Sequence, residues 1–196
     1  CNTATAVALE KVKESYSLPV FGVIRPGAIE AARKTRNKRI GIVGTEVTIR
    51  NKSYEKMIKE IDQTMIIFSN GCSNQIIREM EEYALKNKST IKTLLKECIE
   101  PLIKNGIDTL VWGCTHYPFL REYIEEEIDT NIVQVDPSEA TIREVKDLLH
   151  KKHLNNNITT DREDLFFISG NPDLFAGIAR KLLGYSAGKF QKVRID

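Results

Sequence analysis

The sequence predicts an α/β fold built on mainly parallel sheets, and three observations carry this prediction. Short apolar runs rich in β-branched residues recur along the 196-residue chain. The longer stretches between them repeat apolar residues every three or four positions, which is the spacing of an amphipathic helix. Glycine and Asp-Pro signals separate the two kinds of segment. Strands that alternate with helices form parallel sheets, because each helix returns the chain to the edge where the next strand starts.

Each element can be placed from these patterns. Gly106 after Asn105 predicts the end of a helix, and Asp136 is expected to cap another one, with Pro137 in its first turn. The expected strands span residues 19–24, 39–43, 64–68, 109–112, 132–135 and 165–168. The expected helices are centred on residues 6–16, 91–102, 119–128, 145–149 and 174–183.

Composition excludes several classes of protein. Hydrophobic residues make up 41% of the chain and charged residues 29%, which is ordinary for a globular domain and too apolar for a disordered one. The formal net charge is +2, so no overall field favours nucleic acid or a membrane as a partner. A basic cluster at residues 33–39 is interpreted as a solvated helix end, because no aromatic residues interleave with it. The longest apolar runs are much too short to span a bilayer.

The four cysteines argue against a metal site. No two stand as C-x-x-C, and only His116 lies near a cysteine, so we expect no bound metal. An even number of cysteines would allow two disulfides, but a core of this size does not need them. We therefore expect reduced thiols in a cytoplasmic protein. Cys98 lies on an apolar helical stripe and is expected in the core, whereas Cys72, in a turn-like stretch, is given no role.

The strongest chemical signal is the stretch 112–118, which reads Trp-Gly-Cys-Thr-His-Tyr-Pro. It follows an apolar strand and precedes an expected helix, and α/β proteins bind ligands at such strand ends. Cys114 would lie near a helix N-terminus, whose partial positive charge favours the thiolate. His116 could act with it as an acid or as the partner of the thiolate. The alternative is a small buried cysteine that only packs a turn.

Two further turns carry polar side chains. Cys1 is followed by Asn2 and Thr3, which could donate hydrogen bonds to an anion, although Thr3 could equally be a helix cap. Thr45 and Thr48 could hold a carboxylate oxygen or cap the next helix. In an α/β protein the helix after Cys1 should follow a strand, so we expect the chain to be a fragment whose preceding strand is missing.

Taken together, these stretches resemble the cofactor-independent glutamate racemases. The family pattern has a Cys-Asn-Thr-Ala turn and a later Gly-Cys-Thr-His-Tyr-Pro turn, which match residues 1–4 and 113–118. Supporting matches lie at residues 21–28, 44–49, 135–145 and 167–172. The resemblance implies that no cofactor is used, and it implies two facing three-layer α/β domains with mainly parallel sheets, the first of them incomplete. Residues 1–24 and 133–196 would be the remnant of the first domain, and residues 25–132 would form the second.

The resemblance also implies that two cysteines exchange protons with the substrate Cα from opposite faces. Cys1 would face the Cα proton of D-glutamate and Cys114 that of L-glutamate, one as thiolate and the other as thiol. His116 would assist Cys114. Glu81 is the expected carboxylate beside the second cysteine, and Glu82 is the alternative. The residues that would hold the substrate carboxylate and amine are Asn2, Thr3, Thr45, Thr48 and Thr115.

The expected substrate is glutamate, with D-glutamate supplied for peptidoglycan, and a homodimer is left open. The alternatives are a racemase for aspartate or another amino acid and a non-catalytic binding domain. A thiol hydrolase built on Cys114 and His116 is disfavoured, because no third group that orients the histidine can be named. Arg25 replaces a glutamate of the family pattern. Because the family's Asp-Ser-Gly and Pro-Tyr-Gly turns are not in this sequence, we expect the 196 residues alone not to racemise glutamate.

Overall fold

The structure, a computed structural model, describes residues 1–81, 87–125, 131–156, 163–184 and 188–195. The helices are α1 (Asn2–Ser15), α2 (Ile24–Lys34), α3 (Glu46–Asn51), α4 (Ser53–Ile61), α5 (Gln75–Glu81), α6 (Lys88–Lys104), the 3-10 helix η1 (Tyr117–Leu120), α7 (Glu122–Glu125), α8 (Pro137–Lys151) and α9 (Pro172–Leu183). The strands are β1 (Arg39–Gly44), β2 (Ile66–Gly71), β3 (Thr109–Gly113), β4 (Val133–Val135), β5 (Leu165–Ile168) and β6 (Lys189–Lys192). None of the helices in the described ranges is long and apolar enough to cross a membrane.

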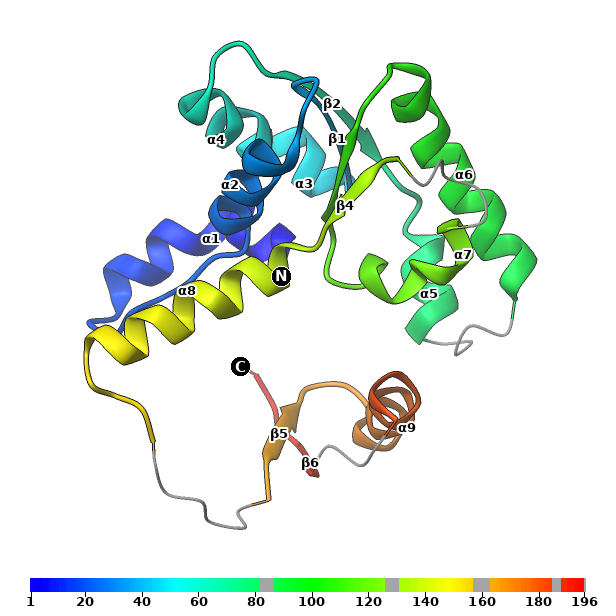
Figure 1. The fold of residues 1–196 in the computed structure, drawn as a ribbon. Coiled ribbons are helices and arrows are strands. Elements are labelled where there is room, and N and C mark those ends of the chain that lie inside the picture. The colour runs from blue at the N-terminus through cyan, green and yellow to red at the C-terminus, as the bar shows by residue number, and fades with distance from the viewer. Residues whose placement is uncertain (82–86, 126–130, 157–162, 185–187, 196) are drawn as a thin grey trace.

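A four-stranded parallel sheet forms the centre of the fold, in the strand order β2-β1-β3-β4 (Figure 1). β1 pairs with β2 on one side and with β3 on the other, so that Ile42 lies opposite Ser69 and Val111. The strands expected at 39–43, 109–112 and 132–135 are confirmed, and so is their parallel pairing. The strand expected at 64–68 is displaced by a few residues to Ile66–Gly71.

Two hydrophobic cores lie on opposite faces of this sheet, because successive side chains of a strand point to opposite faces. Along β3, Leu110 and Trp112 belong to one core and Val111 to the other. The first core is closed by α5 and α6 and the second by α2 and α4, which Figure 1 shows on the two sides of the sheet. Helices, sheet and helices therefore form three layers.

The predicted start of one helix and the predicted end of another are confirmed. Asp136 caps α8, because its Oδ1 accepts a hydrogen bond from Ser138 N at 2.8 Å. Gly106 follows α6 with a φ of 68°, a conformation in which glycine is favoured. The helix expected at 119–128 begins earlier and is divided into η1 and α7, and residues 126–130 lie outside the described part of the chain.

The strand expected at residues 19–24 is wrong. Residues 19–23, which the structure describes, form no strand, and α2 begins at Ile24. The stretch packs against α1 instead: Val23 N donates to Thr5 Oγ1 at 3.3 Å, and a Cβ on Gly22 would lie 2.5 Å from Leu9 Cδ2. An apolar run can be buried against a helix as well as in a sheet, so its composition alone does not determine strand pairing.

The C-terminal part forms a smaller unit of two parallel strands, β5 and β6, and the helix α9 (Figure 1). The rings of Phe166 and Phe190 stack between the strands with their centroids 5.1 Å apart. No residue of α9 is buried, and all of its residues are described. β5 was predicted at its observed bounds, whereas β6 was missed, because Lys189–Lys192 holds a single apolar residue. The division into domains at residues 24 and 132 stays a prediction.

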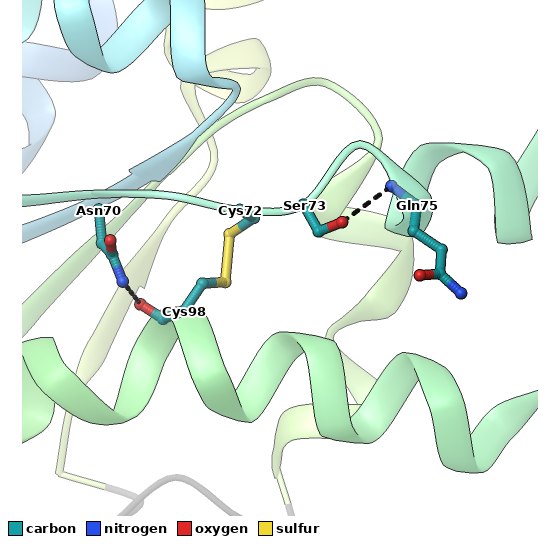
Figure 2. Close-up of a disulfide and its surroundings, with 5 residues drawn as sticks. All are labelled: Asn70, Cys72, Ser73, Gln75 and Cys98. Atoms are coloured by element: carbon teal, nitrogen blue, oxygen red, sulfur yellow. Dashed lines mark hydrogen bonds between the residues drawn. A yellow bond between two sulfur atoms is a disulfide. The ribbon is translucent and has the colours of Figure 1, made fainter.

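Two of the four cysteines form a disulfide, so the expectation of reduced thiols is wrong for this pair. Figure 2 shows the bond between Cys72, which follows β2, and Cys98 on α6. Their Cα atoms are 5.3 Å apart, within the range that a disulfide requires. Asn70 Nδ2 also donates to the carbonyl oxygen of Cys98 at 2.8 Å, so the strand end and the helix are joined twice. Cys98 lies in the core as predicted, and Cys1 and Cys114 are free.

Candidate active site

The C-terminal ends of the three central strands meet at one edge of the sheet. Gly44 of β1 pairs with Gly71 of β2 and with Gly113 of β3. Open α/β sheets bind their ligands at this edge. The residues that follow the three glycines are therefore brought to the same place, and they are Thr45, Cys72 and Cys114.

Glycine is required at the end of β3, because the two backbones approach closely there. A Cβ on Gly113 would lie 2.7 Å from the carbonyl oxygen of Val43, a contact that real side chains do not make. The bare backbone lets β1 and β3 stay paired up to the residues before Thr45 and Cys114.

Three side chains from two segments of the chain form a row that starts at Cys114. Its Sγ lies 3.7 Å from Nδ1 of His116, and Nε2 of His116 lies 2.8 Å from Oε1 of Glu81. An ionised carboxylate only accepts hydrogen bonds, so Nε2 carries a hydrogen and donates a hydrogen bond to Glu81. In the neutral ring Nδ1 is then the acceptor that faces the thiol. The row can therefore move a proton between sulfur and imidazole, while Glu81 fixes the ring and stabilises its positive charge.

The structure brings Glu81, the first of the two predicted carboxylates, into direct contact with His116. The other one, Glu82, lies outside the described residues. Glu81 is also a third group that orients the histidine, which the residue pattern alone, without the family resemblance, could not name. Its position 35 residues before His116 explains this, because only the fold brings α5 next to the turn after β3.

Burial sets the protonation state of Cys114. The residue is 6% exposed, and burial raises the pKa of its thiol; the charge of Glu81 acts in the same direction. Hydrogen bonds from the backbone N–H groups of His116 and Tyr117 lower the pKa but do not outweigh burial. The N–H groups at the start of η1 thus favour the thiolate, as expected, but burial outweighs them and the net pKa is raised.

Three threonine hydroxyls form a second cluster. Thr3 Oγ1 lies 2.9 Å from Thr45 Oγ1 and 3.2 Å from Thr48 Oγ1, and the last two atoms are 3.0 Å apart. Thr45 also caps α3, because its hydroxyl accepts a hydrogen bond from Thr48 N. The Thr45 side chain thus caps a helix and also lies within hydrogen-bond distance of the other two hydroxyls. Each hydroxyl can rotate to donate to an anion, so the cluster is suited to a carboxylate.

The remaining predicted residues lie at the start of α1 and after Cys114. Cys1 is exposed and precedes α1, which begins at Asn2, so the alternative in which Thr3 caps this helix is wrong. Thr115 is exposed.

A cavity of about 770 Å³ opens beside the histidine. Its lining includes Glu81, Thr115 and His116 together with apolar side chains, most of them from β5, β6 and α9, such as Phe167. In the described part of the chain, no three His, Cys, Asp or Glu side chains are grouped so that they could hold a metal ion. Arg25, which departs from the family pattern, lies 4.0 Å from Glu144 of α8 and so has an acidic partner there.

Two buried tyrosines near these groups were not predicted as site residues. Tyr54 donates from its hydroxyl to Asn2 Oδ1 at 2.6 Å. The hydroxyl of Tyr117 is buried without a hydrogen-bond partner in the described structure, and burial followed by the charge of Cys114 raises its pKa. Tyr117 stands inside the motif and could have been included. Tyr54 is 52 residues from its partner, and no pattern in the sequence connects the two.

Comparison with known proteins identifies the family of this chain. The profile of the Asp/Glu/hydantoin racemase family matches residues 1–145. A glutamate racemase of Enterococcus faecalis is 37% identical over 199 aligned positions, which cover 100% of this chain and 71% of that protein. The solved glutamate racemase RacE1 of Bacillus anthracis is 34% identical with a TM-score of 0.85, covering 100% of this chain and 71% of that one. The solved glutamate racemase of Francisella tularensis, in complex with D-glutamate, is 25% identical with a TM-score of 0.88. The match covers 100% of this chain and 72% of that one. The fold is thus the mixed α/β fold of these structures, and the chain belongs to the Asp/Glu/hydantoin racemase family.

Proposed function

We propose that this protein interconverts L- and D-glutamate by proton transfer at Cα, without a cofactor. The observation that carries the proposal is the row of Glu81, His116 and Cys114 at the sheet edge where the threonine cluster also lies. A proton-transfer group that is oriented by a histidine and a carboxylate suits acid–base chemistry. The neighbouring hydroxyls suit a substrate that carries carboxylates.

The reaction needs one base and one acid on opposite faces of Cα. In the direction from D- to L-glutamate, the thiolate of Cys1 takes the Cα proton, so that the Cα–H bond breaks and an S–H bond forms. The thiol of Cys114 then gives its proton to the opposite face of Cα and becomes the thiolate. The raised pKa of Cys114 fits the acid role at the start of this direction. In the reverse direction the two cysteines exchange roles.

His116 and Glu81 serve the thiolate form of Cys114. When the thiol has lost its proton, a protonated imidazole at 3.7 Å would stabilise the negative sulfur. Glu81 at 2.8 Å would in turn stabilise that imidazolium. This pair offsets the burial that disfavours the thiolate. Buried as a thiol, Cys114 is unlike the activated nucleophile that a thiol hydrolase needs, although His116 now has its orienting group.

The substrate would be held by the amide of Asn2 and by the hydroxyls of the threonine cluster, with Thr115 at the edge of the cavity. As the resemblance to glutamate racemases implies, we place the reaction in the cytoplasm and its product in peptidoglycan synthesis. A homodimer stays a prediction. Aspartate remains the alternative substrate within the family, since its carboxylates would meet the same hydroxyls.

The decisive experiment measures deuterium incorporation at Cα in deuterated water. It uses the protein in the form that its organism produces. L-glutamate is the substrate, and the two enantiomers are separated early in the reaction and analysed by mass spectrometry. Two bases on opposite faces predict deuterium in the D-glutamate formed and little in the remaining L-glutamate. Deuterium found equally in both enantiomers would indicate a single base and would contradict the proposal. The same assay with L-aspartate tests the alternative substrate.

Cysteine variants complete the test. Cys114→Ala should lose racemisation in both directions, because one face of Cα is then left without its acid or base. Cys98→Ala is the matched control, since it also removes a buried cysteine but leaves the row at Cys114 in place. Folding of both variants is checked by circular dichroism. A Cys114→Ala protein that racemises at the wild-type rate would refute the assignment of this residue.

A further inference from the structure

We propose that Tyr54 is a positioning residue for the substrate carboxylate, because its hydroxyl fixes the amide of Asn2 in the orientation that donates to the substrate. The inference rests on the proposed function, and it adds a residue that no sequence motif marks. Tyr54 itself touches no reacting atom. It would act through Asn2.

The contact joins two elements that are far apart in the sequence. Tyr54 lies in the first turn of α4, and Asn2 is the first residue of α1. The Tyr54 hydroxyl donates to Asn2 Oδ1 at 2.6 Å, and the two residues are 3% and 2% exposed. A short hydrogen bond between two buried side chains holds both in place, because neither can exchange its partner for water.

This bond decides which end of the amide is available. An amide has one oxygen that accepts and one NH₂ group that donates. The oxygen of Asn2 is occupied by Tyr54, and no other hydrogen bond ties the Asn2 side chain to a residue that the structure describes. The NH₂ group is therefore left to donate, and the next residue, Thr3, carries the hydroxyl that meets Thr45 and Thr48. A carboxylate at this cluster accepts hydrogen bonds and would be bound by the amide as well as by the hydroxyls.

The surroundings of Tyr54 keep its hydroxyl both protonated and fixed. Burial raises the pKa of Tyr54, and the negative charge of Asp136 raises it further, so the hydroxyl remains a donor across the physiological pH range. A Cβ on Gly27 would lie 3.2 Å from the hydroxyl oxygen and 2.8 Å from Pro137. Gly27 of α2 therefore lies close to the Tyr54 hydroxyl, and the ring belongs to the core that α2 and α4 share, which holds the hydroxyl next to Asn2.

A purely structural explanation is that the hydroxyl only satisfies a buried amide. The two explanations differ in what Tyr54→Phe does to substrate binding. A structural role would lower stability and leave the Michaelis constant unchanged. A positioning role raises KM for both enantiomers while kcat changes less, because the amide holds the carboxylate in the ground state and the transition state alike.

The experiment is a double-mutant cycle of Tyr54→Phe and Asn2→Ala, read as KM and kcat for both enantiomers. Tyr54→Phe should raise KM on the order of 10-fold, the effect of one hydrogen bond to a charged group. In the Asn2→Ala background the same change should have no further effect on KM. Ile58→Val is the matched control: it lies one turn along α4 in the same core, so it should lower stability and leave KM unchanged.

Each outcome has a definite meaning. Independent, multiplying effects of the two substitutions on KM, or an unchanged KM in Tyr54→Phe, would overturn the role of Tyr54 while the proposed function stands. Absence of glutamate racemisation in the unsubstituted protein, in the form that its organism makes, would instead refute the proposed function. If Tyr54→Phe does not fold, Asn2→Asp replaces it, since aspartate still accepts from Tyr54 but has no NH₂ group. An unchanged KM in Asn2→Asp would also overturn the inference.

Discussion

Reduction of the disulfide between Cys72 and Cys98 should destabilise the protein by an amount that can be worked out from the structure. The bond closes a loop between residues 26 positions apart. The loss of loop entropy in the unfolded chain is worth about 3.5 kcal/mol at 25 °C for a loop of this length. With a denaturant dependence of about 2 kcal/mol per molar urea, the unfolding midpoint should fall by about 1.5–2 M.

The assay is urea unfolding with and without a phosphine reductant, followed by circular dichroism. The Cys98→Ala variant is the control: its midpoint should not respond to the reductant, because Cys1 and Cys114 are free thiols already. Thiol titration of the unreduced, denatured protein should find two reactive groups. Four reactive groups, or equal midpoints in the two conditions, would refute the disulfide and the stabilisation assigned to it.

Three further perturbations have definite expected results. Hydrogen bonds to Asp108 outweigh burial and lower its pKa. The ionised carboxylate therefore contributes to stability above its ordinary pKa of 3.8, and this contribution is lost as the pH falls below that value. Urea unfolding midpoints measured between pH 2 and 5 should show the loss, and the Asp108→Asn variant should show a weaker pH dependence. Brief iodoacetamide treatment should label Cys1 before Cys114, because the latter is 6% exposed with a raised pKa; mass spectrometry showing the reverse order would contradict this. Glu81→Gln should lower kcat at least about 10-fold, since His116 loses the charge that stabilises its protonated form, and an unchanged kcat would remove Glu81 from the mechanism.

The fold was largely readable from the sequence, because parallel α/β folds repeat a strong local pattern. Apolar runs gave β1, β3, β4 and β5, and the caps at Asp136 and Gly106 were visible as residue types. Local pattern failed where tertiary packing decided the outcome. Residues 19–23 are apolar but lie against α1, and β6 is polar but pairs with β5.

The candidate site divides in the same way. The turn around Cys114 and His116 is contiguous in the sequence, so its chemistry could be proposed from the residue types and their spacing. Contacts between distant segments could not be predicted from spacing. Two such contacts are that of Tyr54 with Asn2 and the disulfide beside β2. Glu81 beside the turn of Cys114 was expected only from the family resemblance. The protonation of Cys114 was also missed, because burial is a property of the folded chain.

The glycines at the ends of β1 and β3 have an evolutionary consequence. A side chain on Gly113 would collide with the backbone of Val43, and one on Gly44 would lie 3.1 Å from the carbonyl oxygen of Gly113. Either change would displace the residues that follow, and a displacement of about 1 Å can cost on the order of 100-fold in rate. Substitutions at Gly44 and Gly113 should therefore not be tolerated. New substrate preferences would have to arise from residues such as Thr115, which is exposed and free to vary without moving the strands.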